Sequence, residues 1–167
     1  MTLRANSRLA GVAYIFYLVA GIATMAVRDL PHAVNLLNII TSFCALILGV
    51  TLYAITRDQD RDLAMLAMLC RVIEAVPGRG EIYFAVGSTL FAWLLLRGRL
   101  IPVALAWLGV AASAGLVVLL AVQSAGVFEL GWSSPITWVV WMPMLVFEMT
   151  FALWLLTKGV GNTIHTL

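Results

Sequence analysis

Six apolar runs separated by short polar segments dominate this sequence and set the class of fold that it can adopt. They cover residues 9–27, 33–55, 63–76, 82–96, 101–122 and 136–156. A membrane-spanning helix needs about 20 apolar residues to cross a hydrocarbon core of about 30 Å. Only 11% of the 167 residues are charged, against about 25% in a typical soluble domain. We therefore predict an all-α, polytopic integral membrane helix bundle that forms a single domain over residues 1–167.

The third and fourth runs are short, with 14 and 15 residues, and they meet at the sequence PGRGE (77–81). We expect both to cross, giving six transmembrane helices, because Arg61 and Asp62 can extend the third run inward and the bilayer can thin locally. A re-entrant hairpin is the alternative, since it would also start and finish on the cytoplasmic side. The first run is longer than the apolar core of a typical signal peptide, and it lacks a clear A-x-A cleavage site. We therefore interpret it as a retained span.

The basic residues favour one orientation of this bundle. If the N-terminus is cytoplasmic, only Arg28 and Arg79 lie in outer segments. The other seven basic residues outside the runs then lie in inner segments: Arg4, Arg8, Arg57, Arg61, Arg97, Arg99 and Lys158. Cytoplasmic loops of membrane proteins carry an excess of lysine and arginine. The pattern predicts that both termini face the cytoplasm.

Polar side chains from several runs fall at similar depths when residues are counted from the cytoplasmic edge at about 1.5 Å each. Four of them lie roughly 12 Å deep by this count: Tyr17, Arg71, Ser88 and Glu148. Three more lie somewhat further out: Thr41, Ser42 and Glu74. We predict that these seven residues form the polar centre of the bundle.

Arg71 is the expected hub of this centre. A lone charge at mid-bilayer costs from about 2.5 kcal/mol upward, and a guanidinium has five donors that can serve two carboxylates. We predict that Arg71 contacts Glu148, with Glu74 flanking on the same helical face. The sequence leaves three roles open for this cluster: fixing helix register alone, binding a ligand or ion, or catalysis. Other small and polar positions are assigned to helix packing, among them Gly11, Tyr14, Leu18, Gly21 and Gly49.

Several kinds of site find no support in the sequence. Cys44 and Cys70 lie inside apolar runs and form no metal-binding pattern, and the single lysine, Lys158, lies outside every run, which excludes a retinal Schiff base. No histidine lies at the level of Arg71, so we name no catalytic residue. The net charge of +2 does not indicate nucleic acid. We expect no metal, no cofactor and no nucleic-acid partner.

Four stretches, in order along the chain, resemble an uncharacterised bacterial membrane family, domain of unknown function 4386. They are RLAGVAYIFYLVAG (8–21), LGVTLYAITRDQDRDLAMLAMLCRVIEAV (48–76), LLLRGRLIPVALAWLG (94–109) and FEMTFALWLLTKG (147–159). In that family an R-x-x-E pair and a glutamate before a final W-L-L recur, and here they match Arg71, Glu74 and Glu148. The resemblance implies a six-helix bundle in the bacterial inner membrane, with no known activity. The segment between the third and fourth runs is shorter here than in the family.

Three classes of function remain open. We favour a non-enzymatic membrane protein, either an accessory subunit or a binder of a small ligand, because the loops are too short for a soluble active site. The alternatives are a proton- or anion-coupled carrier of small solutes and a membrane-embedded hydrolase of lipid-like substrates. The expected partners are the lipid bilayer and a membrane protein or second copy of the chain. A carrier requires a water-filled path to the cluster, whereas an accessory subunit requires a dry cluster and a broad apolar surface.

Overall fold

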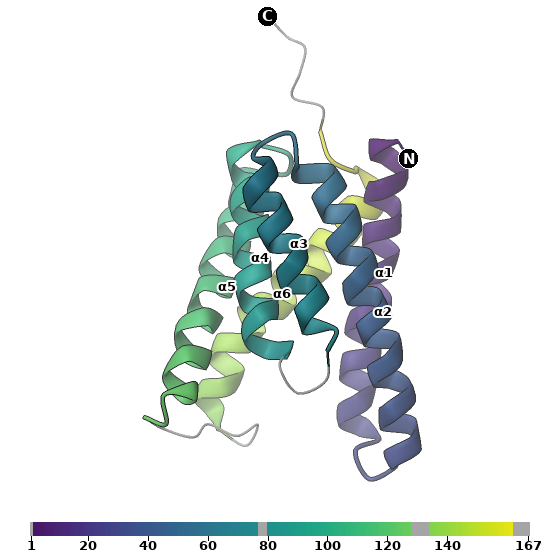
Figure 1. The fold of residues 1–167 in the computed structure, drawn as a ribbon, viewed down its shortest axis with the longest axis vertical. Helices are drawn as coiled ribbons and strands as arrows, with labels where there is room; N and C mark the ends of the chain where they lie inside the picture. Colours follow the sequence, from purple (N-terminus) through teal and green to yellow (C-terminus); the bar gives the residue numbers. More distant parts are fainter. Residues whose placement is uncertain (1, 77–79, 128–133, 162–167) are drawn as a thin grey trace, which may run out of the picture.

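The computed structural model describes residues 2–76, 80–127 and 134–161 (Figure 1). The regular elements of these residues are six α-helices, which confirms the all-α prediction. They are α1 (Leu3–Ala26), α2 (Pro31–Thr56), α3 (Arg61–Glu74), α4 (Gly80–Arg97), α5 (Val103–Ser124) and α6 (Pro135–Thr157).

Polar residues and prolines mark where the helices begin. The Oγ1 atom of Thr2 accepts a hydrogen bond from the backbone N–H of Ala5, so α1 begins six residues before the apolar run that predicted it. Asp60 caps α3 in the same way through the N–H of Leu63. Such side-chain acceptors satisfy donors that the first helical turn leaves unpaired. Pro31 begins α2 and Pro135 begins α6, where proline is tolerated because that N–H has no helical partner.

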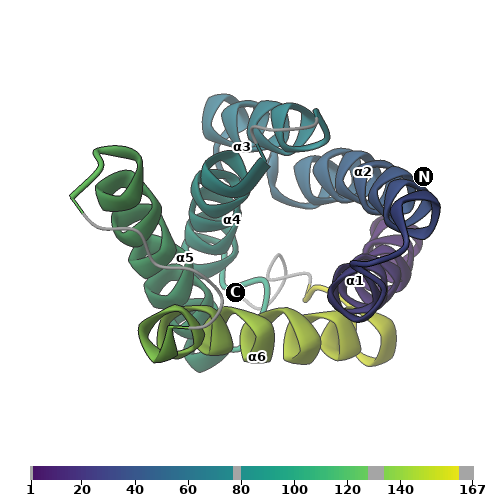
Figure 2. The same cartoon turned by 90° about the horizontal axis from the view of Figure 1, so that it is seen from below.

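The helices form a closed ring in chain order. Each helix from α1 to α5 contacts the next one, and α6 contacts both α5 and α1. Figure 2 shows this ring from one end, with α6 crossing between α5 and α1. In Figure 1, α6 starts beside the lower end of α5 and rises toward the upper part of α1. The side chains that face the inside of the ring therefore come from helices far apart in the sequence.

The helices differ in length. By length and composition, α1, α2, α5 and α6 can each cross a membrane. α3 and α4 hold 14 and 18 residues, roughly 21 and 27 Å at 1.5 Å per residue. Their lower ends stop above the lower ends of the other four helices in Figure 1. Four candidate spans are therefore present within the described residues. The crossing of all six helices stays a prediction beside the re-entrant alternative.

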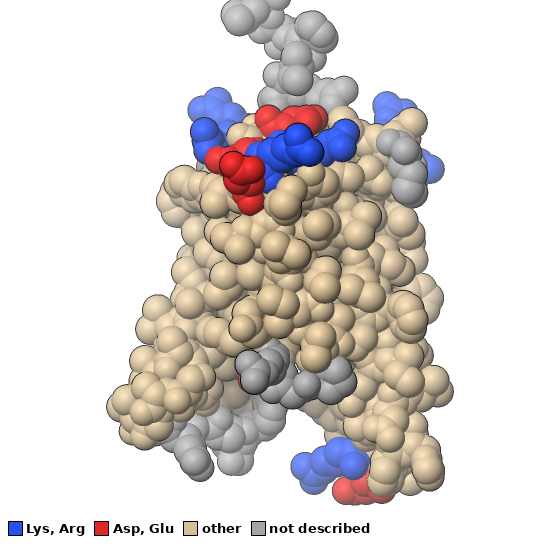
Figure 3. Space-filling view, viewed as in Figure 1, with Lys and Arg blue, Asp and Glu red and all other residues tan. Residues whose placement is uncertain are grey.

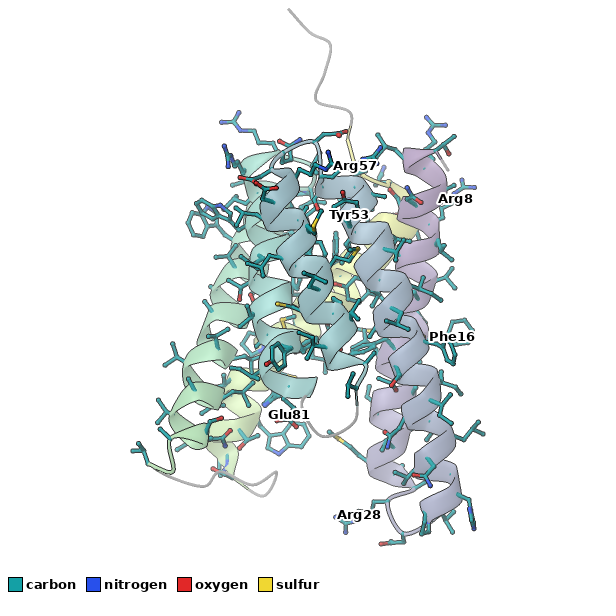
Figure 4. The ribbon with its side chains drawn as sticks, viewed as in Figure 1. Arg8, Phe16, Arg28, Tyr53, Arg57 and Glu81 are labelled. Carbon is teal, nitrogen blue, oxygen red and sulfur yellow. The ribbon has the colours of Figure 1, made fainter. Side chains whose placement is uncertain are left out.

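Charged side chains gather at the end of the molecule that holds the N-terminus (Figure 3). Arg8 and Arg57 lie at this end and Arg28 lies at the opposite one (Figure 4). The charged side chains of the described residues include an ion pair between Arg97 Nη1 and Asp60 Oδ2, 3.4 Å apart. Arg79, the other basic residue expected at the outer side, falls outside the described residues. The charge asymmetry read from the sequence is present in the fold, while its direction across a membrane stays a prediction.

Candidate functional site

Arg71 lies in the last turn of α3 and is fully buried. Two glycines let the neighbouring helices approach it closely. A Cβ atom at Gly49 of α2 would lie 3.1 Å from the Cβ of Arg71, and one at Gly87 of α4 would lie 3.0 Å from the Cβ of Cys70. Real Cβ atoms rarely approach so closely. Helix α3 is therefore held between α2 and α4 at a spacing that only small residues allow, and Gly49 has the packing role expected of it.

The guanidinium of Arg71 donates hydrogen bonds to three helices. Its Nη1 atom donates to both carboxylate oxygens of Glu74 on α3, at 2.9 and 3.2 Å. Its Nη2 atom donates to Ser88 Oγ on α4 at 3.2 Å and to the Tyr14 hydroxyl on α1 at 3.4 Å. Tyr17 of α1 donates its hydroxyl to Glu74 Oε1 at 2.7 Å. Together these bonds join α1, α3 and α4 at one point.

Aromatic rings enclose the same guanidinium. Its Cζ atom lies 4.9 Å from the ring centre of Phe84, 5.8 Å from that of Tyr17 and 6.0 Å from that of Tyr14. Cations within about 6 Å of an aromatic face are attracted by the ring quadrupole. Phe84 also stacks between Tyr17 and Trp141, with ring centres 6.2 and 6.0 Å apart. These rings provide part of the environment that keeps a positive charge inside the bundle.

Glu148 of α6 forms the ion pair with Arg71 that the sequence predicted. Its Oε1 atom lies 3.9 Å from Arg71 Nη2, which confirms the pair. That distance exceeds the 2.7–3.2 Å usual for an N–H···O hydrogen bond. The Oε1 atom of Glu148 and the Nε atom of Arg71 are buried without a hydrogen-bond partner. Glu74, predicted to flank Arg71, is the closer of the two carboxylates, at 2.9 Å from Nη1.

Two of the predicted polar residues do not hydrogen-bond to the cluster. Thr41 Oγ1 donates to the carbonyl of Leu37 in its own helix, and Ser42 Oγ donates to the carbonyl of Ala75 at the end of α3. Tyr14, which was assigned to packing, is instead a direct partner of Arg71. It lies three residues before Tyr17, and residues three apart share a helix face. That spacing was the available signal that Tyr14 belongs with Tyr17.

A cavity of about 330 Å³, here called the polar cavity, adjoins the cluster, and polar and apolar surface contribute to its lining in similar measure. It lies between α1, α2 and the neighbouring ends of α3 and α4. Its polar lining residues are Tyr17, Asn38, Thr41, Ser42, Glu74 and Glu81. Glu81 is exposed and lies at the lower end of α4 (Figure 4). Thr41 and Ser42 therefore share a space with Glu74 without bonding to it.

A second cavity, of about 420 Å³, is mainly apolar. It lies between α1 and α6, and Glu148 is part of its lining. Among its apolar residues are Leu18, Ile22, Met25, Met142, Met144 and Leu145. The two cavities share four lining residues: Tyr17, Thr41, Phe84 and Trp141. The two cavities thus adjoin, and one glutamate of the Arg71 cluster lies in each.

Within residues 2–76, 80–127 and 134–161, no three His, Cys, Asp or Glu side chains are grouped so that they could hold a metal ion. Cys44 and Cys70 are buried free thiols. The groups assembled here are hydrogen-bond acceptors, hydroxyls and aromatic faces around one fixed positive charge. This arrangement suits the binding of a polar or positively charged group beside an apolar chain.

Comparison with protein families gives a match over the C-terminal half of the described helices. The family model described as "Domain of unknown function (DUF4386)" matches residues 78–159, which include α4, α5 and α6. Ser88 and Glu148 lie within the matched residues, whereas Arg71 and Glu74 precede them. Neither the comparison with curated proteins nor that with solved structures gives a significant match. Over residues 78–159 the chain therefore carries a domain of the DUF4386 family, as the resemblance in its sequence predicted.

Proposed function

We propose that this chain is an intramembrane binding protein for a small amphiphile. One observation carries the proposal: the polar cavity, whose lining is mixed, and a mainly apolar cavity adjoin at Tyr17, Phe84 and Trp141. Volumes of about 330 and 420 Å³ lie in the range of roughly 300–1,000 Å³ typical of small-molecule sites. A molecule with a polar head and an apolar tail would match the linings of both cavities at once. A purely polar solute would not match the apolar cavity.

This proposal develops the ligand-binding form of the non-enzymatic class that the sequence favours. An accessory subunit with a dry cluster fits less well, because the cavities reach Glu74 and Glu148 even though Arg71 itself is fully buried. A carrier is the second candidate, favoured by the polar cavity that leads to Glu74. A carrier would move the bound molecule between the two sides of a proteoliposome, whereas a binding protein would only retain it.

We also propose that the basic end of the bundle faces the cytoplasm of a bacterium. Arg8 and Arg57 lie at that end (Figure 4), among the charged side chains gathered there (Figure 3), which supports this orientation. The family resemblance supports the bacterial inner membrane. In this orientation the polar cavity lies on the outer side of the Arg71 cluster, next to the recessed ends of α3 and α4. The amphiphile would then reach its site from the outer leaflet.

The binding proposal can be tested with the tryptophans of the apolar cavity. Trp138 and Trp141 line it, so an alkyl alcohol with the chain length of undecanol, brominated at its far end, would quench their fluorescence. The protein would be reconstituted in phosphatidylcholine nanodiscs. Only the quenching that an excess of the non-brominated alcohol reverses would be counted, because non-specific partition into lipid is not displaceable.

Two glycine variants compare a filled apolar cavity with an unchanged one. Gly21 lines the apolar cavity, and a Cβ there would meet nothing within 4 Å, so Gly21→Leu would place a side chain in the cavity without a clash at its Cβ. Gly115 of α5 has the same open surroundings but is exposed and lines neither cavity. We expect displaceable quenching in the wild type and in Gly115→Leu, and at least tenfold weaker binding in Gly21→Leu. Equal binding by all three proteins, or displaceable quenching in none, would show that the proposal is wrong.

A further inference from the structure

Both cavities have acidic side chains in their linings. Glu74 and Glu81 line the polar one and Glu148 lines the apolar one, whereas no described arginine, lysine or histidine lines either. Among the described basic residues, Arg71 pairs with two of these carboxylates, lines neither cavity and is fully buried. A ligand that enters the cavities therefore meets carboxylates and not the guanidinium. Electrostatic complementarity favours a positively charged group.

The hydrogen bonds of Arg71 leave the Oε1 atom of Glu148 without a donor. Nη1 is occupied by Glu74, and Nη2 by Ser88 and Tyr14. The Oε1 atom of Glu148 has no hydrogen-bond partner, and its side chain is only 4% exposed. A buried acceptor left unmatched is unfavourable, the more so when it carries charge. A donor supplied by a ligand in the apolar cavity would remove this cost.

Aromatic rings stand where the two cavities adjoin. Tyr17, Phe84 and Trp141 line both, and the faces of such rings attract ammonium groups. Trp is the most effective of the three residue types in this interaction. An ammonium at the junction would thus have carboxylates on either side and aromatic faces around it, while its alkyl chain lay among the methionine and leucine side chains of the apolar cavity.

We propose that the amphiphile bound by this chain carries an ammonium group, and that this group donates a hydrogen bond to the carboxylate of Glu148. The inference rests on the proposed function, because it specifies the head group of the same amphiphile. Two sources offer this chemistry: a single-chain alkyl amine and the amino group of a phosphatidylethanolamine. Both present N–H donors on a positive charge beside an apolar chain.

The test compares an amine with a neutral alcohol of the same chain. The nanodisc assay described above would be run with the brominated undecyl alcohol and with the corresponding brominated undecyl amine. Because charge-assisted hydrogen bonds are roughly twice as strong as neutral ones, we expect the amine to bind the wild type at least tenfold more tightly. In Glu148→Gln, which keeps the size of the side chain, the preference should fall to about twofold or less. Asp58→Asn is the control, because it removes one negative charge at an exposed residue of the α2–α3 turn. In this variant the preference for the amine should persist.

The outcomes separate the two proposals. Equal binding of amine and alcohol by the wild type, with both weakened by Gly21→Leu, would overturn the ammonium inference and leave the proposed function intact. No displaceable binding of either probe would overturn both. Because the wild type alone gives this comparison, the test holds even if Glu148→Gln does not fold. If phosphatidylethanolamine in the nanodisc displaces the amine, the source is the lipid head group. If it does not displace the amine, the source is a single-chain amine.

Discussion

The Nη2 atom of Arg71 and the Oε1 atom of Glu148 lie 3.9 Å apart inside the bundle, and no hydrogen bond joins them. Both side chains are almost fully buried. Their attraction is therefore that of two nearby charges, while the directional bonds of Arg71 go to Glu74, Ser88 and Tyr14. This unequal sharing fixes α3 against α1 and α4 and leaves the Oε1 atom of Glu148 on α6 without a hydrogen bond.

Replacing Arg71 by alanine should strongly destabilise the protein. The change would leave Glu74 and Glu148 buried without their positive partner, and removing one member of a buried pair typically costs about 3–5 kcal/mol. Cys70→Ala, at the neighbouring buried position, removes only a small group and should cost about 1 kcal/mol. The free energy of unfolding, measured by titration with sodium dodecyl sulfate in mixed micelles, would compare the two. Equal losses would mean that the charge of Arg71 contributes little.

The two glutamates should differ in their effect on stability. Glu74→Gln weakens two hydrogen bonds from Arg71 and one from Tyr17, so we expect a loss of about 3 kcal/mol or more. Glu148→Gln removes a carboxylate that has no hydrogen bond at Oε1, and its effect should stay within about 1 kcal/mol. The same unfolding titration measures both variants. A larger loss for Glu148→Gln would contradict the geometry of the cluster.

The packing of α3 against α4 should be sensitive to the size of residue 87. A Cβ at Gly87 would lie 3.0 Å from the Cβ of Cys70 and 3.2 Å from the backbone oxygen of Ala67. Gly87→Leu should therefore push the helices apart and cost about 1–3 kcal/mol or more. Gly115→Leu, where nothing lies within 4 Å, provides the control on a helix of the same bundle. A melting temperature equally affected by both changes would show that the close approach is not required.

The orientation can be tested by labelling single cysteines in intact cells, after Cys44 and Cys70 are replaced by alanine. Asp58→Cys should react only from the cytoplasmic side and Leu30→Cys only from outside. Gly80 lines the polar cavity, so Gly80→Cys should react from outside with a small charged reagent and poorly with a bulky one. Reaction of position 58 from outside would reverse the proposed orientation. Reaction of position 80 only from inside would contradict the proposed outward position of the polar cavity.

The sequence predicted where the helices lie better than it predicted which side chains contact one another. Six apolar runs yielded six helices, and counting depth along them brought Tyr17, Ser88 and Glu148 to Arg71. The count did not find Tyr14, because depth alone does not say which face of α1 points inward. It placed both glutamates beside Arg71 but could not say which one takes the hydrogen bonds. Glu74, three residues along the same helix, accepts them from Nη1, while Glu148 Oε1 stays 3.9 Å from Nη2.

The cavities could not be predicted from the sequence. They depend on the shortness of α3 and α4, which the apolar runs did indicate, and on the slanted path of α6 (Figure 1). The path of α6 does not follow from hydrophobic length. Trp141 shows the limit most clearly. As a single aromatic residue in an apolar run it gave no signal, but it lines both cavities and stacks on Phe84.

Native mass spectrometry of protein taken from its own membranes tests the central claim, that the adjoining cavities hold an amphiphile. We predict that the wild type and Gly115→Leu retain a bound molecule of constant mass, and that Gly21→Leu loses it. Fragmentation of that molecule should release an amine. The claim is contradicted if the three proteins carry the same adducts, as they would with surrounding lipid alone, or if none of them retains a bound molecule.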